Sequence, residues 1–175
     1  MKATAYVEDQ VVYNIQYWEI PGYLKNMNYF FRYCLGATAA IFVYDMSKKT
    51  SLEKISSWIT ETDQCEIPIR YLVGTKLDQF DSTKAGADRN QGREIANKFG
   101  LQYFEVAAVT EGGVNELFQN IFTSMKNLIP NPPKPENLLG RGIVLGKKLL
   151  TSQKYQLVNL VLISKALCDL ATIYE

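Results

Sequence analysis

The sequence predicts an α/β protein built on an open, mostly parallel sheet, and three observations indicate this class. Ala39–Asp45 is a continuous apolar run, which is typical of a strand covered on both faces. A second apolar run starts at Tyr71 and ends in Thr75-Lys76-Leu77-Asp78. Helical patterns follow both runs, as in strand–helix alternation. Because open α/β sheets bind ligands at the carboxyl ends of their strands, Lys76 and Asp78 mark the expected site.

The first predicted elements are two strands that form a hairpin. Thr4–Val7 is joined to Val11–Trp18 by the polar connection Glu8–Gln10. In the second strand, apolar and polar residues alternate from Tyr13, so one face is expected to be more apolar than the other.

Three helices and a further strand are predicted after the first apolar run. Thr50–Glu53 reads Thr-Ser-Leu-Glu, a capping box that predicts a helix start. Amphipathic patterns predict helices over Gln91–Phe99, closed by Gly100, and over Val114–Leu128. Between them, Tyr103–Thr110 is predicted to be a strand and turn.

The composition changes after residue 128. Residues 129–142 are rich in proline and predict a stiff linker between a domain over residues 1–128 and an extension over residues 143–175. Apolar residues recur at roughly helical spacing in the extension. We therefore expect it to be a helix that packs on a partner protein; the alternative is a strand within its own sheet.

Composition excludes several functions. With 19 basic and 18 acidic residues, no long-range field favours nucleic acid or an anionic membrane. There is no histidine, and the three cysteines have no paired spacing, so a zinc cluster and a Ser-His-Asp triad are not expected. No signal peptide, transmembrane run or C-terminal prenylation motif is recognised, which predicts an intracellular protein, cytoplasmic or on a cytoplasmic assembly, without a C-terminal lipid anchor.

Several short motifs resemble those of Rab-like and Ras-like small GTPases. Thr75–Asp78 resembles the Asn-Lys-x-Asp guanine-specificity element, with Thr in place of Asn. Trp18–Tyr23 resembles Trp-Asp-Thr-Ala-Gly-Gln, and Glu105–Thr110 resembles Glu-Thr-Ser-Ala-Lys-Thr. The resemblance covers residues 3–128 and starts in the family's second strand, which implies the open parallel sheet of that family with its first strand missing.

The resemblance implies a guanine-binding half of a site. The Asp78 carboxylate would accept the two parallel N–H bonds that a guanine base offers, and the stem of Lys76 would lie along the base. Thr75 takes the place of the family's Asn, and the backbone amides of Ala107 and Ala108 would contact the base.

The phosphate half is degenerate in this sequence. Gly22 keeps the backbone position that senses the γ-phosphate, and Glu19 replaces the Asp that supports Mg²⁺ through water. Tyr23 replaces the Gln that orients water, and a phenol cannot do that work. No Gly-x-x-x-x-Gly-Lys-Ser/Thr loop occurs, and Gly146-Lys147 lacks its spacing. No catalytic residue is predicted and no cofactor is expected, with GTP or GDP and Mg²⁺ as the ligands if any nucleotide binds.

The missing first strand leaves a structural gap. In the family it lies in the middle of the sheet, between the third and fourth strands, so its removal would expose two inner edges. Three candidates could fill the space: an upstream segment lost from a truncated gene model, a strand from another protein, or the apolar segment around Tyr155–Ile163.

Two functions are consistent with these features. The first is a degenerate Rab-like protein that does not hydrolyse GTP and serves as a binding or scaffold subunit. Its partners would be other protein subunits, bound through residues 143–175 and the open sheet edge. The second is an active GTP-binding Rab-like GTPase represented by an incomplete sequence, which an upstream in-frame Gly-rich loop would support.

Overall fold

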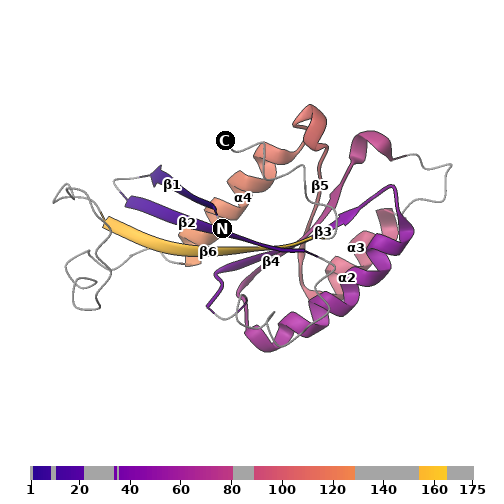
Figure 1. Ribbon diagram of the computed structural model, residues 1–175, viewed down its shortest axis with the longest axis horizontal. Helices are drawn as coiled ribbons and strands as arrows, with labels where there is room; N and C mark the ends of the chain where they lie inside the picture. Colours follow the sequence, from indigo (N-terminus) through magenta and orange to yellow (C-terminus); the bar gives the residue numbers. More distant parts are fainter. Residues whose placement is uncertain are drawn as a thin grey trace.

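The computed structural model describes residues 2–8, 11–21, 34, 36–80, 89–128 and 154–164, and the structural statements below concern these residues. They form a six-stranded sheet in the order β1-β2-β6-β3-β4-β5. Helices cover both faces of this sheet, with α4 on one side and α2 and α3 on the other (Figure 1). The predicted α/β class is confirmed.

The predicted hairpin is present at one edge of the sheet. β1 (Lys2–Glu8) pairs antiparallel with β2 (Val11–Pro21), which continues beyond the predicted end at Trp18. Ile15 packs into the core on the α4 side, and Ile20 packs into the core on the α2 side. Because β2 lies inside the sheet, both of its faces contribute buried residues.

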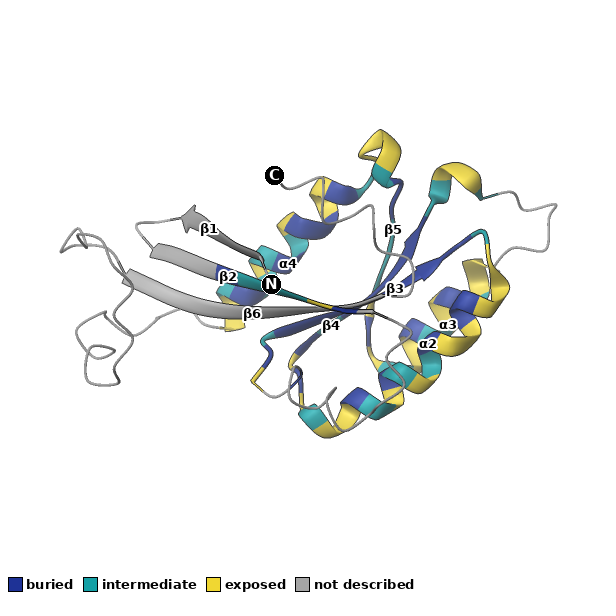
Figure 2. Ribbon diagram, viewed as in Figure 1, coloured by how far each residue is buried: buried dark blue, intermediate teal, exposed yellow. Residues whose placement is uncertain are grey.

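The parallel part of the sheet follows the apolar runs. β3 (Ala39–Asp45) is buried along its whole length and pairs with β4 (Ile69–Thr75), which pairs with β5 (Gln102–Glu105). Figure 2 shows buried residues on β3 and β4 and on the helix sides that face them. Burial on both faces explains why the first run contains no alternation of polar residues.

Three α-helices flank the strands: α2 (Lys49–Thr62), α3 (Arg89–Phe99) and α4 (Val114–Leu128). Short 3-10 helices lie at η1 (Asp63–Cys65), η2 (Leu77–Gln79) and η3 (Ala108–Thr110). The predicted bounds of α4 are confirmed, and Gly100 ends α3 with a φ of 66°, in the left-handed region where glycine carries no steric penalty.

The predicted capping box is wrong. α2 starts at Lys49, its N-cap residue is Lys48, and no side chain caps it. Ser51, which the box places just after its cap, instead uses its Oγ to accept a hydrogen bond from the backbone N–H of Asp45, at 3.0 Å. Because the helix starts one residue before Thr50, the hydroxyl that the box assigned as the cap does not lie at the N-cap position.

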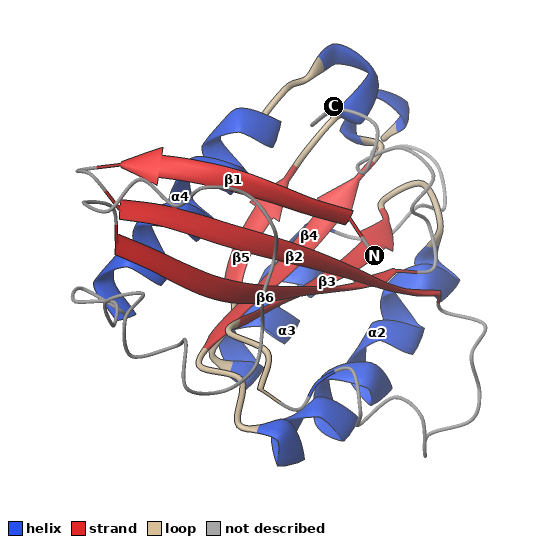
Figure 3. Ribbon diagram, turned by 60° about the vertical axis from the view of Figure 1, so that its left-hand side comes forward, coloured by secondary structure: helices blue, strands red, loops and turns tan. Residues whose placement is uncertain are grey.

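The helix predicted for the C-terminal extension is wrong over Lys154–Ser164, which forms strand β6. β6 lies between β2 and β3 and is parallel to both (Figure 3). It pairs with β2 from Val11 to Pro21 and with β3 from Ala39 to Val43. The central gap is thus filled by the chain's own apolar segment, one of the three candidates considered from the sequence.

β6 closes the two inner edges that the sequence predicted to be open. Binding of a partner at those edges is therefore not available in this arrangement. The rest of the predicted extension, the linker over residues 129–142 and Gly22 lie outside the described residues. Among the helices that the structure describes, none is long and apolar enough to cross a membrane.

Removal of β6 is expected to detach the hairpin. In the described sheet β6 joins β1 and β2 to β3, so deleting residues 154–175 would leave backbone groups of β2 and β3 unpaired. We expect a lower unfolding midpoint in urea and loss of amide hydrogen-exchange protection in β2. Deleting residues 165–175 alone is the control and keeps the strand. Unchanged protection of β2 after the larger deletion would contradict this role.

Candidate base-binding site

The predicted guanine elements meet at the carboxyl ends of β4 and β5. The backbone N–H of Val106 donates to the carbonyl of Gly74 at 2.8 Å. The N–H of Leu77 donates in turn to the carbonyl of Val106 at 3.2 Å. These two bonds place the segment that carries Asp78 beside the segment that starts at Ala107, as the resemblance implied.

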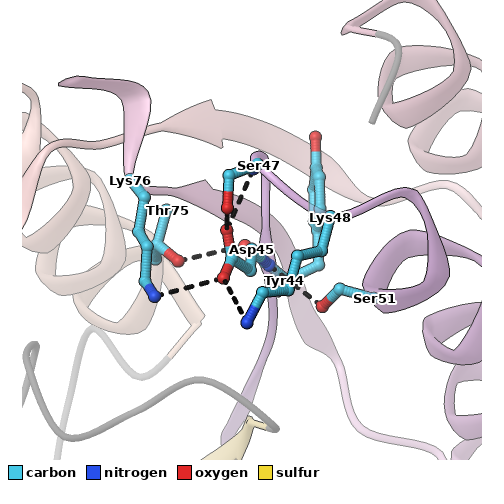
Figure 4. Close-up of polar contacts among 7 residues, drawn as sticks. All are labelled: Tyr44, Asp45, Ser47, Lys48, Ser51, Thr75 and Lys76. Atoms are coloured by element: carbon cyan, nitrogen blue, oxygen red, sulfur yellow. Dashed lines mark hydrogen bonds and ion pairs between the residues drawn. The ribbon is translucent and has the colours of Figure 1, made fainter. Parts of the chain in front are cut away.

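A buried carboxylate anchors this edge. Asp45, at the end of β3, has a side chain that is 4% exposed, and its Oδ2 lies 3.1 Å from Lys76 Nζ and 3.8 Å from Lys48 Nζ (Figure 4). Its Oδ1 accepts hydrogen bonds from the backbone N–H and the hydroxyl of Ser47, at 2.9 and 2.6 Å. Both carboxylate oxygens are therefore engaged. Lys48 is largely exposed, so Lys76 is the closer and more buried partner.

The environment keeps Asp45 ionised. Burial by itself would raise the pKa of this carboxyl group, but the hydrogen bonds from Ser47 and Lys76 outweigh burial and lower the pKa below its ordinary value. Lys76 has a φ of 61°, in the left-handed region that non-glycine residues rarely adopt. The same residue forms the ion pair with Asp45, and non-glycine residues in this backbone region cluster at functional sites.

Thr75 and Asp78 have different environments. Thr75 is buried, and its hydroxyl donates to the carbonyl of Tyr44 at 3.0 Å, which commits this side chain to β3. Asp78 lies in η2 and is exposed. The residue expected to recognise guanine is therefore at the surface, where its carboxylate can accept hydrogen bonds from a ligand.

The two predicted alanine positions are not equivalent. Ala107 donates its backbone N–H to the carbonyl of Gly112 at 2.9 Å, so this amide is used within the turn and its predicted contact with a base is not supported. Ala108 starts η3 and remains the candidate from this element. Val109, which replaces the family's Lys, is 79% exposed.

Glu19, the residue predicted to support Mg²⁺ through water, lies apart from the base site. Glu19 is exposed on β2 and pairs in register with Leu162 of β6, which pairs with Ile41 of β3. Ile41 precedes Asp45 by four residues, about 13 Å of strand. Within the described ranges, no three His, Cys, Asp or Glu side chains are grouped as metal ligands. The structure does not bring Glu19 to the base site.

The sequence reading missed a polar network behind the site. Tyr44 and Tyr103 share a hydrogen bond between their hydroxyls at 2.8 Å, and Tyr103 donates to Glu105 at 3.1 Å. Burial raises the pKa of both phenols, so they stay protonated. Gly92 of α3 makes room for them, because a Cβ there would lie 2.5 Å from the Tyr44 hydroxyl oxygen.

The sequence does contain a signal for the buried carboxylate of Asp45, which was not predicted as a site residue. Asp45 is a carboxylate at the end of an otherwise apolar strand.

The sheet order and the guanine-type element at its carboxyl edge define the class of small GTPase-like proteins. The chain matches the Ras family over residues 2–127. It belongs to that family, as a Rab- and Ras-like small GTPase.

Its relatives are Rab proteins. The chain is 30% identical to Ras-related protein Rab-2B of Dictyostelium discoideum, over 67% of this chain and 59% of the relative. It is 29% identical to Ras-related protein Rab-1D of the same organism, over 71% of this chain and 62% of the relative. The chain is 27% identical to Ras-related protein Rab-15 of Homo sapiens, over 65% of this chain and 53% of the relative. The match spans less than two thirds of each relative.

Replacing Asp45 by Asn is expected to destabilise the fold in a pH-dependent way. The variant leaves the charge of Lys76 without its partner, and we expect a loss of about 1–3 kcal/mol in the free energy of unfolding at pH 7. Because the folded-state pKa of Asp45 is lowered, its contribution is present above the ordinary value of 3.8 and is lost as the pH falls through the folded-state pKa. Urea unfolding at several pH values measures this.

The difference between wild type and Asp45→Asn should therefore shrink below about pH 4. Lys48→Gln is the matched control, since this exposed lysine lies farther from the same oxygen, and its effect should stay within about 0.5 kcal/mol. Equal effects of the two substitutions, or a pH-independent loss in Asp45→Asn, would contradict the assigned role of Lys76.

Proposed function

We propose that this Rab-like protein does not hydrolyse GTP and acts as a binding or scaffold subunit of a larger assembly. The observation that carries the proposal is the identity of the central strand. In the family, the first strand occupies this position and leads into the Gly-rich phosphate loop. Here β6 occupies it and ends at Ser164, and no glycine follows Gly146 in the sequence. A backbone cradle for phosphates needs glycine for its close approach.

Substitutions at the site support the same conclusion. Tyr23 stands where the family has the Gln that orients water. Thr75 uses its hydroxyl for Tyr44, and Val109 places an apolar side chain where the family has Lys. The base half keeps Asp78 as an exposed acceptor, so nucleotide binding would be weak and directed to guanine.

A protein-binding role fits an outer edge of the sheet. β6 closes the inner edges, and β1 (Lys2–Glu8) forms an outer edge. An edge strand presents backbone groups that pair with a strand of another protein. We therefore place the expected contact with other protein subunits at β1, in addition to the parts of residues 143–175 that lie outside β6.

The alternative is an active GTP-binding Rab-like GTPase of which this sequence is a part. It is favoured by the retained Gly22, Lys76, Asp78 and Ala108, and by the greater length of the relatives. An upstream strand with a phosphate loop would have to replace β6 between β2 and β3. Sequencing the 5′ end of the transcript tests this directly, and an in-frame Gly-x-x-x-x-Gly-Lys-Ser/Thr would favour the alternative.

The purified 175-residue chain is expected to show no GTP hydrolysis above the uncatalysed rate. The physical reason is that Tyr23 cannot orient water and that β6 is not followed by a glycine loop. Phosphate release with Mg²⁺ and excess GTP measures the rate, and a catalytically competent Rab protein serves as the positive control. Turnover that disappears in Glu19→Ala would overturn the proposal.

A further inference from the structure

Glu105 is a nearly buried carboxylate at the end of β5. Its side chain is 13% exposed, and its Oε2 lies 2.7 Å from Arg89 Nη2. Its Oε1 accepts a hydrogen bond from the Tyr103 hydroxyl at 3.1 Å and lies 3.8 Å from Arg93 Nη2. Both oxygens have partners, so the orientation of this carboxylate is fixed by groups from β5 and α3.

Arg89 links Glu105 to the segment that contains Asp78. It is the first residue of α3, and its guanidinium carbon lies 5.1 Å from the centroid of the Phe80 ring. Phe80 directly follows η2, the short helix that contains Asp78. The cation–π contact and the ion pair together connect the chain just after Asp78 to Glu105.

The residue just before Asp78 is also bonded to the segment that contains Glu105. Leu77 donates its backbone N–H to Val106, the residue next to Glu105, and Val106 donates to Gly74. Asp78 thus lies between Leu77, which bonds directly to Val106, and Phe80, which is linked to Glu105 only through Arg89. Its own carboxylate is exposed, so its position depends on these flanking contacts.

We infer that Glu105 is a positioning residue for recognition of a guanine base: through Arg89 and Phe80 it holds Asp78 beside the amide of Ala108. The inference rests on the guanine-directed binding proposed above. The ligand class is a guanine nucleotide, because a carboxylate in this position accepts the ring N–H and the exocyclic amine together. Glu105 does not touch the base and acts through the residues that it holds.

Comparison of GDP with inosine diphosphate (IDP) tests this inference. Inosine lacks the exocyclic amine, so the ratio of the two dissociation constants reports how strongly the Asp78 carboxylate binds that amine. Binding is measured by calorimetry on the full chain for wild type, Glu105→Gln, Asp78→Ala and the double variant. We expect Glu105→Gln to weaken GDP binding about tenfold and to reduce the preference for GDP over IDP.

A double-mutant cycle separates positioning from general stability. If Glu105 acts through Asp78, the double variant should bind GDP no more weakly than Asp78→Ala alone, because contacting or coupled residues are not additive. A purely structural role would give additive losses and an unchanged preference between GDP and IDP. Thermal unfolding of each variant confirms that the measured protein is folded.

Two further variants serve as controls. Arg93→Gln removes the more distant and more exposed arginine from the same carboxylate, and it should change GDP binding less than about twofold. Arg89→Lys keeps the charge but loses the planar guanidinium, so it should reproduce part of the Glu105→Gln effect. Arg89→Lys also gives a test that does not depend on Glu105→Gln being folded.

The outcomes distinguish this inference from the proposed function. If Asp78→Ala abolishes the GDP preference while Glu105→Gln and Arg89→Lys leave it intact, the positioning role is wrong and the base site stands. Additive losses in the double variant also overturn the positioning role. If wild type binds GDP and ADP equally, the guanine assignment itself fails. If wild type binds no nucleotide, the positioning role is overturned, and the scaffold proposal is unaffected.

Discussion

Backbone groups in the interior of a sheet must be paired, and in this protein β6 meets that requirement for two strands at once. β2 and β3 each present a row of N–H and C=O groups toward one shared position. β6 pairs with the whole of β2 and with five residue positions of β3. The hairpin therefore reaches the main body through β6, and Ile15 and Ile20 of β2 reach the two cores as a result.

The carboxyl edge of the sheet is organised by one buried charge. Taking the carboxylate of Asp45 out of water carries a desolvation cost, which is offset only if its oxygens are well bonded. Ser47 and Lys76 supply those bonds, and Lys76 has a left-handed backbone conformation. Lys76 is thus paired with the buried charge, while Asp78, two residues later, is exposed.

In our proposal the same edge provides base recognition, whereas the given sequence contains no Gly-rich phosphate loop to match it. Phosphate groups are bound by backbone amides and by cations, and those contacts dominate nucleotide affinity in this class of protein. With β6 at the centre, the chain leaves the sheet through Ser164 into a sequence without glycine. A site of this kind would discriminate one base from another but gain little affinity, and this argument is the basis of our proposal of a protein-binding role.

Much of the fold follows from local sequence patterns. The apolar run that ends at Asp45, the pattern over Val114–Leu128 and the left-handed glycine at Gly100 each predict their element, because burial, helical period and backbone freedom are properties of short segments. The guanine-type element is also found from sequence, since Thr75–Asp78 is contiguous and ends a strand.

Tertiary structure decided the rest. The segment Lys154–Ser164 is apolar enough for either a helix or a strand, and it is a strand because an unpaired position between β2 and β3 offers hydrogen bonds on both sides. α2 starts at Lys49, one residue before the predicted capping residue, and Ser51 accepts a hydrogen bond from the N–H of Asp45 at the end of β3. The bond between Arg89 and Glu105 joins residues from two elements. The sequence by itself therefore determined the elements that local burial and period specify, whereas contacts between distant segments depend on which backbone groups and charges would otherwise be buried without partners.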